Sequence, residues 1–426
     1  MHGNVPAMYK RTMPRRFVFT CTLLICTLFT PAWTASLPQA KPEDVGLSGE
    51  RLNRIQTMIQ GYIDRHEIAG AVTLVARRGR VAWLRSQGVA DLQTGQAMRD
   101  DNIFAIASMT KPIASVALMM LYEEGRFQLN DPVARFLPEF KDMKVAVPSA
   151  PAAYKLVPAD RPITIRHLLT HTAGLPNTYV GLTKPEYEKL VAARKPDDTV
   201  GDFTKQLAKL PLNFQPGTSW EYGPATDVVG RLVEVMSGMP LDKYFEEKIF
   251  KPLGMKDTYF YVPDDKVSRR ATIYTRNEGG GIRPLPRAGG GSQKYFSGAG
   301  GLQSTIHDYA RFSQMLLNGG QLDSARLLSR KTIELMTQNH IGDKIKLWDS
   351  LPGERFGLGF SVRTDLGESA NLGSIGMYGW GGAFGTIFWV DPKEQMFGIL
   401  MIQLRPYDHV NIRQDMRTMA YQAVIE

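Results

Sequence analysis

Ser108 and Lys111 are the residues whose types and spacing most directly suggest covalent chemistry in this chain. The segment from Ser108 to Tyr122 is almost entirely apolar, with Pro112 in what would be the first turn and Gly125 as a stop, so it predicts a buried helix. Residues three apart share a helix face, with Cβ atoms about 5–6 Å apart. Burial disfavours a charged lysine, and a helix N-terminus favours a nearby oxyanion. The pattern therefore predicts a Ser-x-x-Lys nucleophile.

The same spacing also has a simpler interpretation. A Ser-x-x-Lys sequence is expected about once by chance in a chain of this length. A serine that caps a helix, followed by a lysine that extends to solvent, would produce it as well. Only further motifs in a suitable order can decide between the two.

A second informative stretch surrounds Tyr222. The turn Tyr222-Gly-Pro224 precedes an apolar helical pattern that ends at Gly238. A tyrosine on a tight turn can direct its hydroxyl into a cleft, although a tyrosine of this kind more often packs as a surface aromatic.

The third stretch is rich in glycine and runs from Gly379 to Gly385, directly before a predicted strand. Gly381 and Gly382 would let a substrate approach the backbone, whose N–H groups could stabilise an oxyanion. The alternative is a glycine-rich hairpin that packs on Trp380.

His167 and His171 stand four apart, as in a zinc protease, but Leu168 replaces the glutamate of that motif. We expect buried or capping histidines here and no metal.

The order of predicted elements indicates an α/β fold. Strands occur near both ends of the chain and helices in the middle, which favours an α/β lobe of residues 41–100 and 294–426 with a mostly helical lobe, 101–293, inserted between them. A ligand site is expected in the cleft between such lobes. The segments 147–153 and 158–162 read as loops with short helical turns, and 275–293 reads as a glycine-rich mobile loop.

Residues 1–36 have the composition of a secretory signal peptide: a basic start, an apolar run and a small-residue region. We expect cleavage between Thr34 and Ala40 and export to the periplasm or medium, with no stable membrane span afterwards. The apolar run of about 13 to 17 residues is short for a bilayer. A twin-arginine route through Arg15-Arg16 and a lipoprotein at Cys26 are the less favoured alternatives.

Composition excludes several classes of function. Without the four basic residues of the leader, 47 basic residues face 42 acidic ones, and they form no basic strip with interleaved aromatics, so no nucleic-acid partner is expected. Both cysteines, Cys21 and Cys26, lie in the leader. The mature chain therefore has no disulfide, no thiol nucleophile and no cysteine-ligated metal.

Taken together, Ser108-Met-Thr-Lys111, Tyr222-Gly-Pro224 and Trp380-Gly-Gly382 resemble the three motifs of the penicillin-recognising serine hydrolases in order and spacing. The likeness covers nearly all of residues 41–426 and is greatest to family VIII carboxylesterases, which are similar to class C β-lactamases. It implies a β-lactamase/transpeptidase-like fold, in which helices flank an antiparallel sheet. Further similar segments are 163–175, 252–258 and 300–305.

The resemblance implies a role for each matching residue. Ser108 would be the acylated nucleophile, and Lys111 and Tyr222 would share the proton transfers, with the identity of the base left open. The backbone N–H groups of Ser108 and Ala383 would form the oxyanion hole, and Trp380, Gly381 and Gly382 would contact substrate. No metal or other cofactor is implied.

Two departures from the β-lactamase pattern bear on the substrate. Trp380 stands where those enzymes have a lysine that attracts the substrate carboxylate, and Pro224 replaces an asparagine that binds the substrate amide. Losing a charge-assisted contact costs about 1.5–3 kcal/mol, so both changes favour an uncharged acyl ester. The expected function is an exported serine esterase for short-chain acyl esters, with some cephalosporin cleavage retained.

Three other functions fit the sequence less well than this esterase does. A β-lactamase or D-alanyl-D-alanine carboxypeptidase is the runner-up, and a binding or scaffold protein that has lost turnover is the remote one. A Ser-His-Asp esterase is disfavoured because no Gly-x-Ser-x-Gly elbow occurs in the chain.

Overall fold

The computed structural model describes residues 1–4, 6–8, 36–150, 153–286 and 293–426. Met1–Thr34 and Ala35–Glu426 are separate units, and every element below belongs to the second. Residues 9–35 of the predicted leader lie outside the described residues, so its cleavage stays a prediction. No helix in the described ranges is both long and apolar enough to cross a bilayer.

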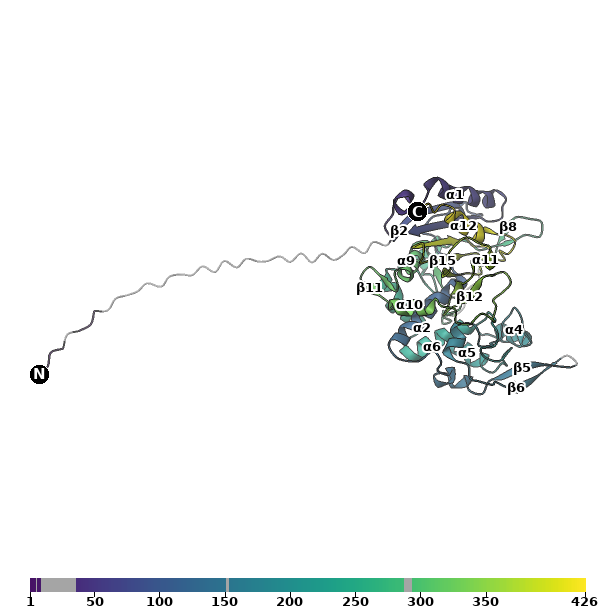
Figure 1. Cartoon of the computed structure of the whole chain (residues 1–426), viewed down its shortest axis with the longest axis horizontal. Helices are drawn as coiled ribbons and strands as arrows, with labels where there is room; N and C mark the ends of the chain where they lie inside the picture. Colours follow the sequence, from purple (N-terminus) through teal and green to yellow (C-terminus); the bar gives the residue numbers. More distant parts are fainter. Residues whose placement is uncertain (5, 9–35, 151–152, 287–292) are drawn as a thin grey trace. The chain divides into compact units, whose positions relative to one another are not determined.

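An eight-stranded antiparallel sheet forms the centre of the folded unit, which confirms the predicted fold class (Figure 1). The strands at both ends of the chain meet where β16 pairs with β1. The spatial order is β12 (Glu354–Phe356), β13 (Ser361–Arg363), β14 (Tyr378–Gly381), β15 (Ile387–Asp391), β16 (Met396–Met401), β1 (Gly70–Arg77), β2 (Arg80–Asp91) and β3 (Gln96–Ala97).

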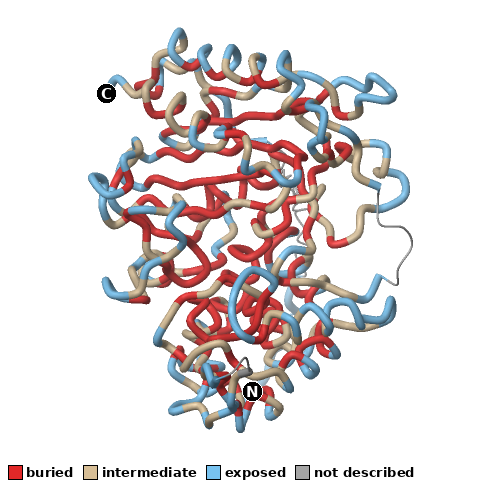
Figure 2. The backbone as a smooth tube through the Cα atoms, turned by 90° about the vertical axis from the view of Figure 1, so that its right-hand side faces the viewer, coloured by how far each residue is buried: buried red, intermediate tan, exposed pale blue. Residues whose placement is uncertain are grey.

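Alternating side chains of the sheet bury against helices on its two faces. Val72 and Leu74 of β1 belong to one apolar cluster, and Ala71 and Val75 belong to the other. The second cluster includes α1 (Gly49–Asp64) and α12 (Ile412–Tyr421), which pack on each other and lie side by side in Figure 1. The central strands are therefore buried on both sides, as Figure 2 shows.

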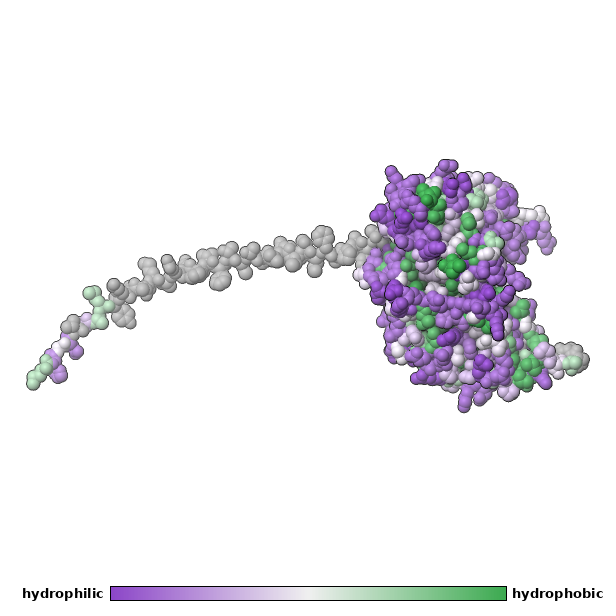
Figure 3. All heavy atoms as spheres, in the orientation of Figure 1, coloured by the Kyte–Doolittle hydropathy of each residue, from purple (hydrophilic) through white to green (hydrophobic). Residues whose placement is uncertain are grey.

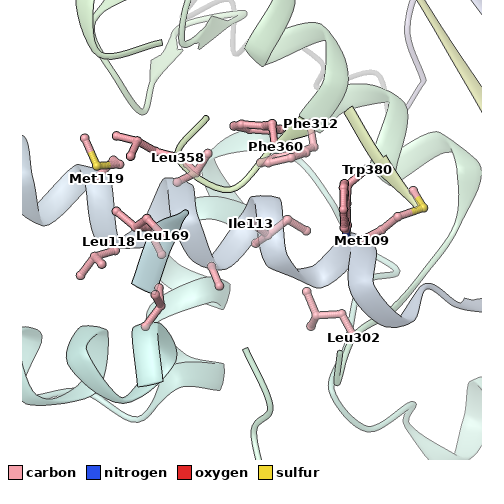
Figure 4. Packing of buried hydrophobic residues seen from close by; sticks show 14 of the residues in the cluster. Met109, Ile113, Leu118, Met119, Leu169, Leu302, Phe312, Leu358, Phe360 and Trp380 are labelled. Carbon is pink, nitrogen blue, oxygen red and sulfur yellow. The ribbon is translucent and has the colours of Figure 1, made fainter. Parts of the chain in front are cut away.

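The first cluster surrounds α2 (Thr110–Glu123), whose residues from Thr110 to Met119 are all buried. Figure 4 shows apolar side chains around this helix, with Trp380 beside Met109 near its start. Two further helices belong to this cluster. Helix α6 (Ala225–Ser237) packs on α2, and α9 (Ile306–Leu317) contacts β15 and β16. On the face seen in Figure 3 the apolar residues form separate patches in a largely hydrophilic surface.

The remaining elements are short and lie mostly between β3 and β12. The helices are α3 (Ile165–Leu169), α4 (Lys184–Ala192), α5 (Val200–Leu207), α7 (Leu241–Phe245), α8 (Lys251–Leu253), α10 (Arg330–Met336) and α11 (Leu366–Ser369). The paired short strands are β4 (Phe104–Ala105) with β9 (Gln303–Ser304), β5 (Lys144–Ser149) with β6 (Ala153–Pro158), β7 (Tyr274–Arg276) with β8 (Ile282–Pro284), and β10 (Gln321–Leu322) with β11 (Ala325–Arg326).

Three local predictions were wrong. In the segment 147–153, residues 147–149 belong to β5 and Ala153 begins its partner β6, whereas residues 151–152 lie outside the described ranges. An isolated pair of strands tolerates a proline such as Pro148, which a central strand would not. The segment 275–293, expected to be a loop, begins with the hairpin of β7 and β8, and its residues 287–292 lie outside the described ranges. Residues 356–362 have the apolar composition that predicts a single strand. A turn at Gly359, where φ is +95°, interrupts it and separates β12 from β13.

Ala35–Glu426 forms one compact unit. The subdivision of this unit into the lobes 41–100 with 294–426 and 101–293 remains a prediction.

Candidate active site

Ser108 lies on a 3-10 turn, Ala107–Met109, that precedes α2 rather than inside the helix. This corrects the expected helix start, and its cause is the residue before the serine. Ala107 has φ of +43°, a left-handed conformation that a residue with a Cβ adopts only at a cost of about 1 kcal/mol or more. The Tyr309 hydroxyl donates a hydrogen bond to the Met109 carbonyl at 2.9 Å and helps to hold the turn. The serine is therefore presented at a sharp, tertiary-stabilised bend.

Lys111 occupies the first turn of α2 and is 4% exposed. Its Nζ donates to Ser108 Oγ at 3.2 Å and to the Ala299 carbonyl at 2.7 Å. The same nitrogen lies 4.5 Å from the centroid of the Tyr222 ring, within the range of a cation–π contact. The structure thus brings Ser108, Lys111 and Tyr222 together, as the sequence motifs predict.

The Tyr222 side chain is fixed by aromatic neighbours. Trp380 Nε1 donates to its hydroxyl at 3.2 Å, and the two ring centroids are 5.4 Å apart. The buried His171 ring lies 4.9 Å from the Tyr222 ring. Burial lowers the pKa of His171 well below its usual value, and the Lys111 charge lowers it further. A neutral imidazole therefore packs beside the tyrosine.

The two histidines considered as a zinc pair have separate structural roles. His167 Nδ1 accepts a hydrogen bond from the Thr164 N–H at the start of α3, whereas His171 packs among aromatic rings. The first is a capping residue and the second is a core residue.

Ser108 and Ala383, the predicted oxyanion donors, line one cavity. Among the described residues, no hydrogen bond uses the backbone N–H of Ser108 or of Ala383. Ala383 follows β14 on a turn in which the Gly385 N–H donates to the Gly382 carbonyl at 3.1 Å. Two N–H groups are thus available to an acyl oxygen in this cavity.

Gly382 allows this turn to approach the nucleophile. A Cβ at Gly382 would lie 2.3 Å from the Ile106 carbonyl oxygen and 2.3 Å from Thr386 Oγ1, both far inside contact distance. Arg413 of α12 holds the turn from the other side. Its guanidinium donates to the carbonyls of Gly382, Gly385 and Thr386.

Asp227, on α6, is a residue that the sequence analysis did not identify. It accepts hydrogen bonds from Ser297 Oγ at 2.6 Å and from the Ala299 N–H at 3.1 Å. Burial raises the pKa of this carboxyl, and the two hydrogen bonds oppose the shift. Because Ala299 also accepts from Lys111, Asp227 positions the lysine through this loop. The only signal in the sequence is an acidic residue within an apolar helical run.

A cavity of about 560 Å³ opens at the nucleophile. Ser108, Tyr222 and the segment from Trp380 to Ala383 line it, and Lys111 reaches Ser108 from behind the lining. The rim carries the partly exposed rings of Tyr179 and Trp348. The geometry therefore combines a hydroxyl, an amine, a phenol and free N–H donors beside a cavity lined by both aromatic and charged side chains.

The chain is similar to known proteins in sequence and in structure. The sequence pattern of the family described as Beta-lactamase matches residues 55–421. Esterase EstB of Burkholderia gladioli is 30% identical over 79% of this chain and 86% of its own length. Lovastatin esterase of Penicillium rubens is 28% identical over 82% and 92% of the two chains. The structure of EstCE1, a hydrolase with promiscuous acyltransferase activity, superposes with a TM-score of 0.75 at 28% identity, covering 87% of this chain and 99% of that one.

Proposed function

Because the chain belongs to the Beta-lactamase family and is a serine hydrolase, we propose that it is a carboxylesterase that cleaves short-chain acyl esters through an acyl-enzyme at Ser108. The observation that carries the proposal is the contact of Lys111 Nζ with Ser108 Oγ at 3.2 Å, beside two unused backbone donors. A partly buried hydroxyl in contact with a buried amine, next to such donors, is suited to acyl transfer.

The reaction follows from the positions of these groups. Ser108 Oγ attacks the ester carbonyl while Lys111 or Tyr222 accepts its proton, and the N–H groups of Ser108 and Ala383 stabilise the oxyanion. The proton then passes to the departing alcohol, which leaves an acyl ester on Ser108. Water attacks this ester by the reverse sequence and regenerates the hydroxyl.

Trp380 and Pro224 support an ester as the substrate. The Trp380 indole donates its one N–H to Tyr222, so it has no charge or further donor for a carboxylate next to the reacting carbonyl. Pro224 lies at the start of α6 and has no side-chain amide with which to bind a peptide or lactam. Both residues therefore favour an uncharged acyl group at the nucleophile.

Hydrolysis of β-lactams or D-alanyl-D-alanine peptides is the second candidate, favoured by the match to the Beta-lactamase family. The test is to measure kcat/KM of the purified protein for 4-nitrophenyl butyrate, for a chromogenic cephalosporin and for a D-alanyl-D-alanine peptide. We expect the butyrate ester to be the best substrate and Ser108→Ala to abolish its turnover. Faster turnover of the lactam or the peptide would replace the esterase proposal with the second candidate.

We also propose that the protein is exported, on the basis of the leader composition. Expression of the full chain in a Gram-negative host, followed by N-terminal sequencing of the periplasmic protein, tests this. A mature N-terminus between residues 35 and 41 is expected, whereas retention of the leader in a cytoplasmic product would contradict it.

A further inference from the structure

The cavity that contains Ser108 also contains charged residues that the proposed mechanism does not use. Arg363 of β13, Glu354 of β12 and Arg417 of α12 all line it. All three are largely withdrawn from water, with side-chain exposures of 1%, 7% and 17%. Charged side chains are rarely buried to this extent unless they are paired.

Pairing among these three is incomplete. Arg363 Nη2 donates to Glu354 Oε1 at 3.4 Å, and Arg417 Nη1 lies 3.9 Å from the same oxygen, beyond hydrogen-bond distance. Within the described ranges, the Nε atoms of both arginines have no hydrogen-bond partner. Glu354 Oε1 is therefore the shared anionic partner of the Arg363 and Arg417 guanidinium groups.

The surrounding charges leave this region positive. Arg413 adds a third guanidinium, whose donors go to neutral carbonyl and hydroxyl oxygens. Asp391 adds one more buried carboxylate, which accepts from the Tyr421 hydroxyl at 2.7 Å. Of the residues that line the cavity, four are arginines (Arg363, Arg405, Arg413 and Arg417) and two are acidic (Glu354 and Asp408); with the buried Asp391 as a third carboxylate, one positive charge remains uncompensated. Burial lowers the pKa of Arg417, an effect that Glu354 opposes and Arg363 strengthens.

We propose that this end of the cavity binds a carboxylate group of the substrate, with Arg417 as its main partner and Arg363 as its second. This inference rests on the proposed esterase function and narrows its substrate class to esters that carry a free carboxylate on the acyl or the alcohol part. One carboxylate would neutralise the uncompensated charge, and its two oxygens match the fork of a guanidinium. Arg417 is the more accessible of the two arginines, and its Cζ lies 5.8 Å from the Trp389 ring, which also lines the cavity.

A preference for an uncharged ester at Ser108 is compatible with a carboxylate site at the arginines, because the two groups would occupy different positions in the cavity. The lysine that β-lactamases place at the third motif is absent at Trp380, so no charge is bound next to the reacting carbonyl. Arg363 and Arg417 lie instead on β13 and α12, and within the described residues neither makes a hydrogen bond to Ser108, Lys111 or Tyr222. The substrate that fits has an uncharged ester at the serine and a carboxylate at the other end of the cavity.

Two matched pairs of esters test the proposal. For a carboxylate on the acyl part, 4-nitrophenyl hydrogen glutarate is compared with 4-nitrophenyl methyl glutarate. For one on the alcohol part, 3-butyryloxybenzoate is compared with its methyl ester. In at least one pair we expect the kcat/KM of the acid to exceed that of its methyl ester by about tenfold or more. The pair that shows this preference tells whether the arginines bind the acyl part or the alcohol part of the substrate.

Variants then assign the preference to the arginines. R417Q should lower the ratio of the two kcat/KM values by about tenfold or more, and R417K should retain part of it because it keeps the charge. R77Q is the matched control, since Arg77 is also buried and paired with one glutamate but does not line the cavity. It should leave the ratio unchanged.

The outcomes separate this inference from the esterase proposal. Turnover of the methyl esters with an acid-to-methyl-ester ratio at or below one in both pairs would overturn the carboxylate subsite alone. An R417Q variant that keeps the wild-type ratio would do the same. Failure of the wild type to hydrolyse any of the four esters would overturn the esterase proposal itself. If R417Q does not fold, the wild-type ratios still decide the question.

Discussion

At the scale of single residues, the site depends on how Lys111 is held. A lysine side chain is flexible, and its orientation toward one hydroxyl costs conformational entropy unless other contacts share the task. Here the Ala299 carbonyl and the Tyr222 ring contact the Lys111 amino group on two further sides. Ala299 is in turn fixed by Asp227. Asp227 therefore helps to align Lys111 with Ser108, although it makes no hydrogen bond to either residue.

Two substitutions of Asp227 test whether this carboxylate positions Lys111. Asp227→Asn keeps a carbonyl oxygen for the Ser297 and Ala299 donors but removes the charge, whereas Asp227→Ala removes both. Because buried donors left unpaired cost about 1–3 kcal/mol, we expect kcat for 4-nitrophenyl butyrate to fall roughly tenfold or more in the alanine variant and less in the asparagine variant. KM should change little. Steady-state kinetics on protein shown to be folded by circular dichroism measures this.

The exposed Asp264 provides a control for the loss of a carboxylate, and Asp264→Asn should behave as the wild type. An Asp227→Ala enzyme with wild-type kcat would show that the loop does not position Lys111.

At the scale of elements, the site lies where β14, the turn after it and the 3-10 turn of Ser108 approach each other. Sequence patterns predicted many of the elements well. The predicted stops Gly125 and Gly238 follow the ends of α2 and α6, because such signals are local. The left-handed Ala107 was not predicted, because only tertiary contacts stabilise an alanine in that conformation. The roles of Asp227 and Arg413 were missed for a related reason: their partners are distant in sequence.

Substitution of Gly382 tests whether catalysis requires the turn with Ala383 to lie close to Ser108. Gly382→Ala would place a Cβ 2.3 Å from the Ile106 carbonyl, so the turn with Ala383 must move away from Ser108. Loss of one oxyanion donor typically lowers kcat by about 10²–10³, and we expect an effect of that order with the fold retained. Kinetics with 4-nitrophenyl butyrate and a thermal melt measure both.

Gly367→Ala is the matched control, because its Cβ would meet only Asp365 Oδ1 at 3.5 Å. Near-normal kcat in Gly382→Ala would contradict the assignment of the Ala383 N–H to the oxyanion hole.

At the scale of the whole molecule, the resemblance of the three motifs predicted the fold class, and the antiparallel sheet with helices on both faces confirms it. The hairpins of β5–β6 and β7–β8 could not be predicted from composition, because their prolines and glycines are equally typical of loops. The motif residues meet because β14 contacts the 3-10 turn Ala107–Met109, where Trp380 lies beside Met109 (Figure 4). The arrangement of the site therefore depends on the stability of the whole folded unit.

Asp308, in the first turn of α9, gives that stability a pH dependence. It accepts from the Asp257 N–H and from Thr258 Oγ1, each at 2.7 Å, and burial raises the pKa of Asp308 from 3.8 to about 6. Between these two pH values the folded state binds more protons than the unfolded chain. This contribution therefore makes the free energy of unfolding fall as pH rises from about 4 to about 6.

Asp308→Asn cannot titrate at this position. The free energy of unfolding of the variant, relative to the wild type, should therefore increase by on the order of 2–3 kcal/mol between pH 4 and pH 7. Urea unfolding of both proteins at the two pH values measures it. A difference that does not change with pH would show that Asp308 keeps an ordinary pKa.

The most direct measurement of the central claim is intact-mass spectrometry after incubation with a fluorophosphonate. If Lys111 and Tyr222 activate Ser108, the wild type gains one adduct that maps to Ser108, Ser108→Ala gains none, and Lys111→Ala and Tyr222→Phe react at least about tenfold more slowly. A folded wild type that gains no adduct, or a Ser108→Ala variant that is labelled at the wild-type rate, would contradict the account.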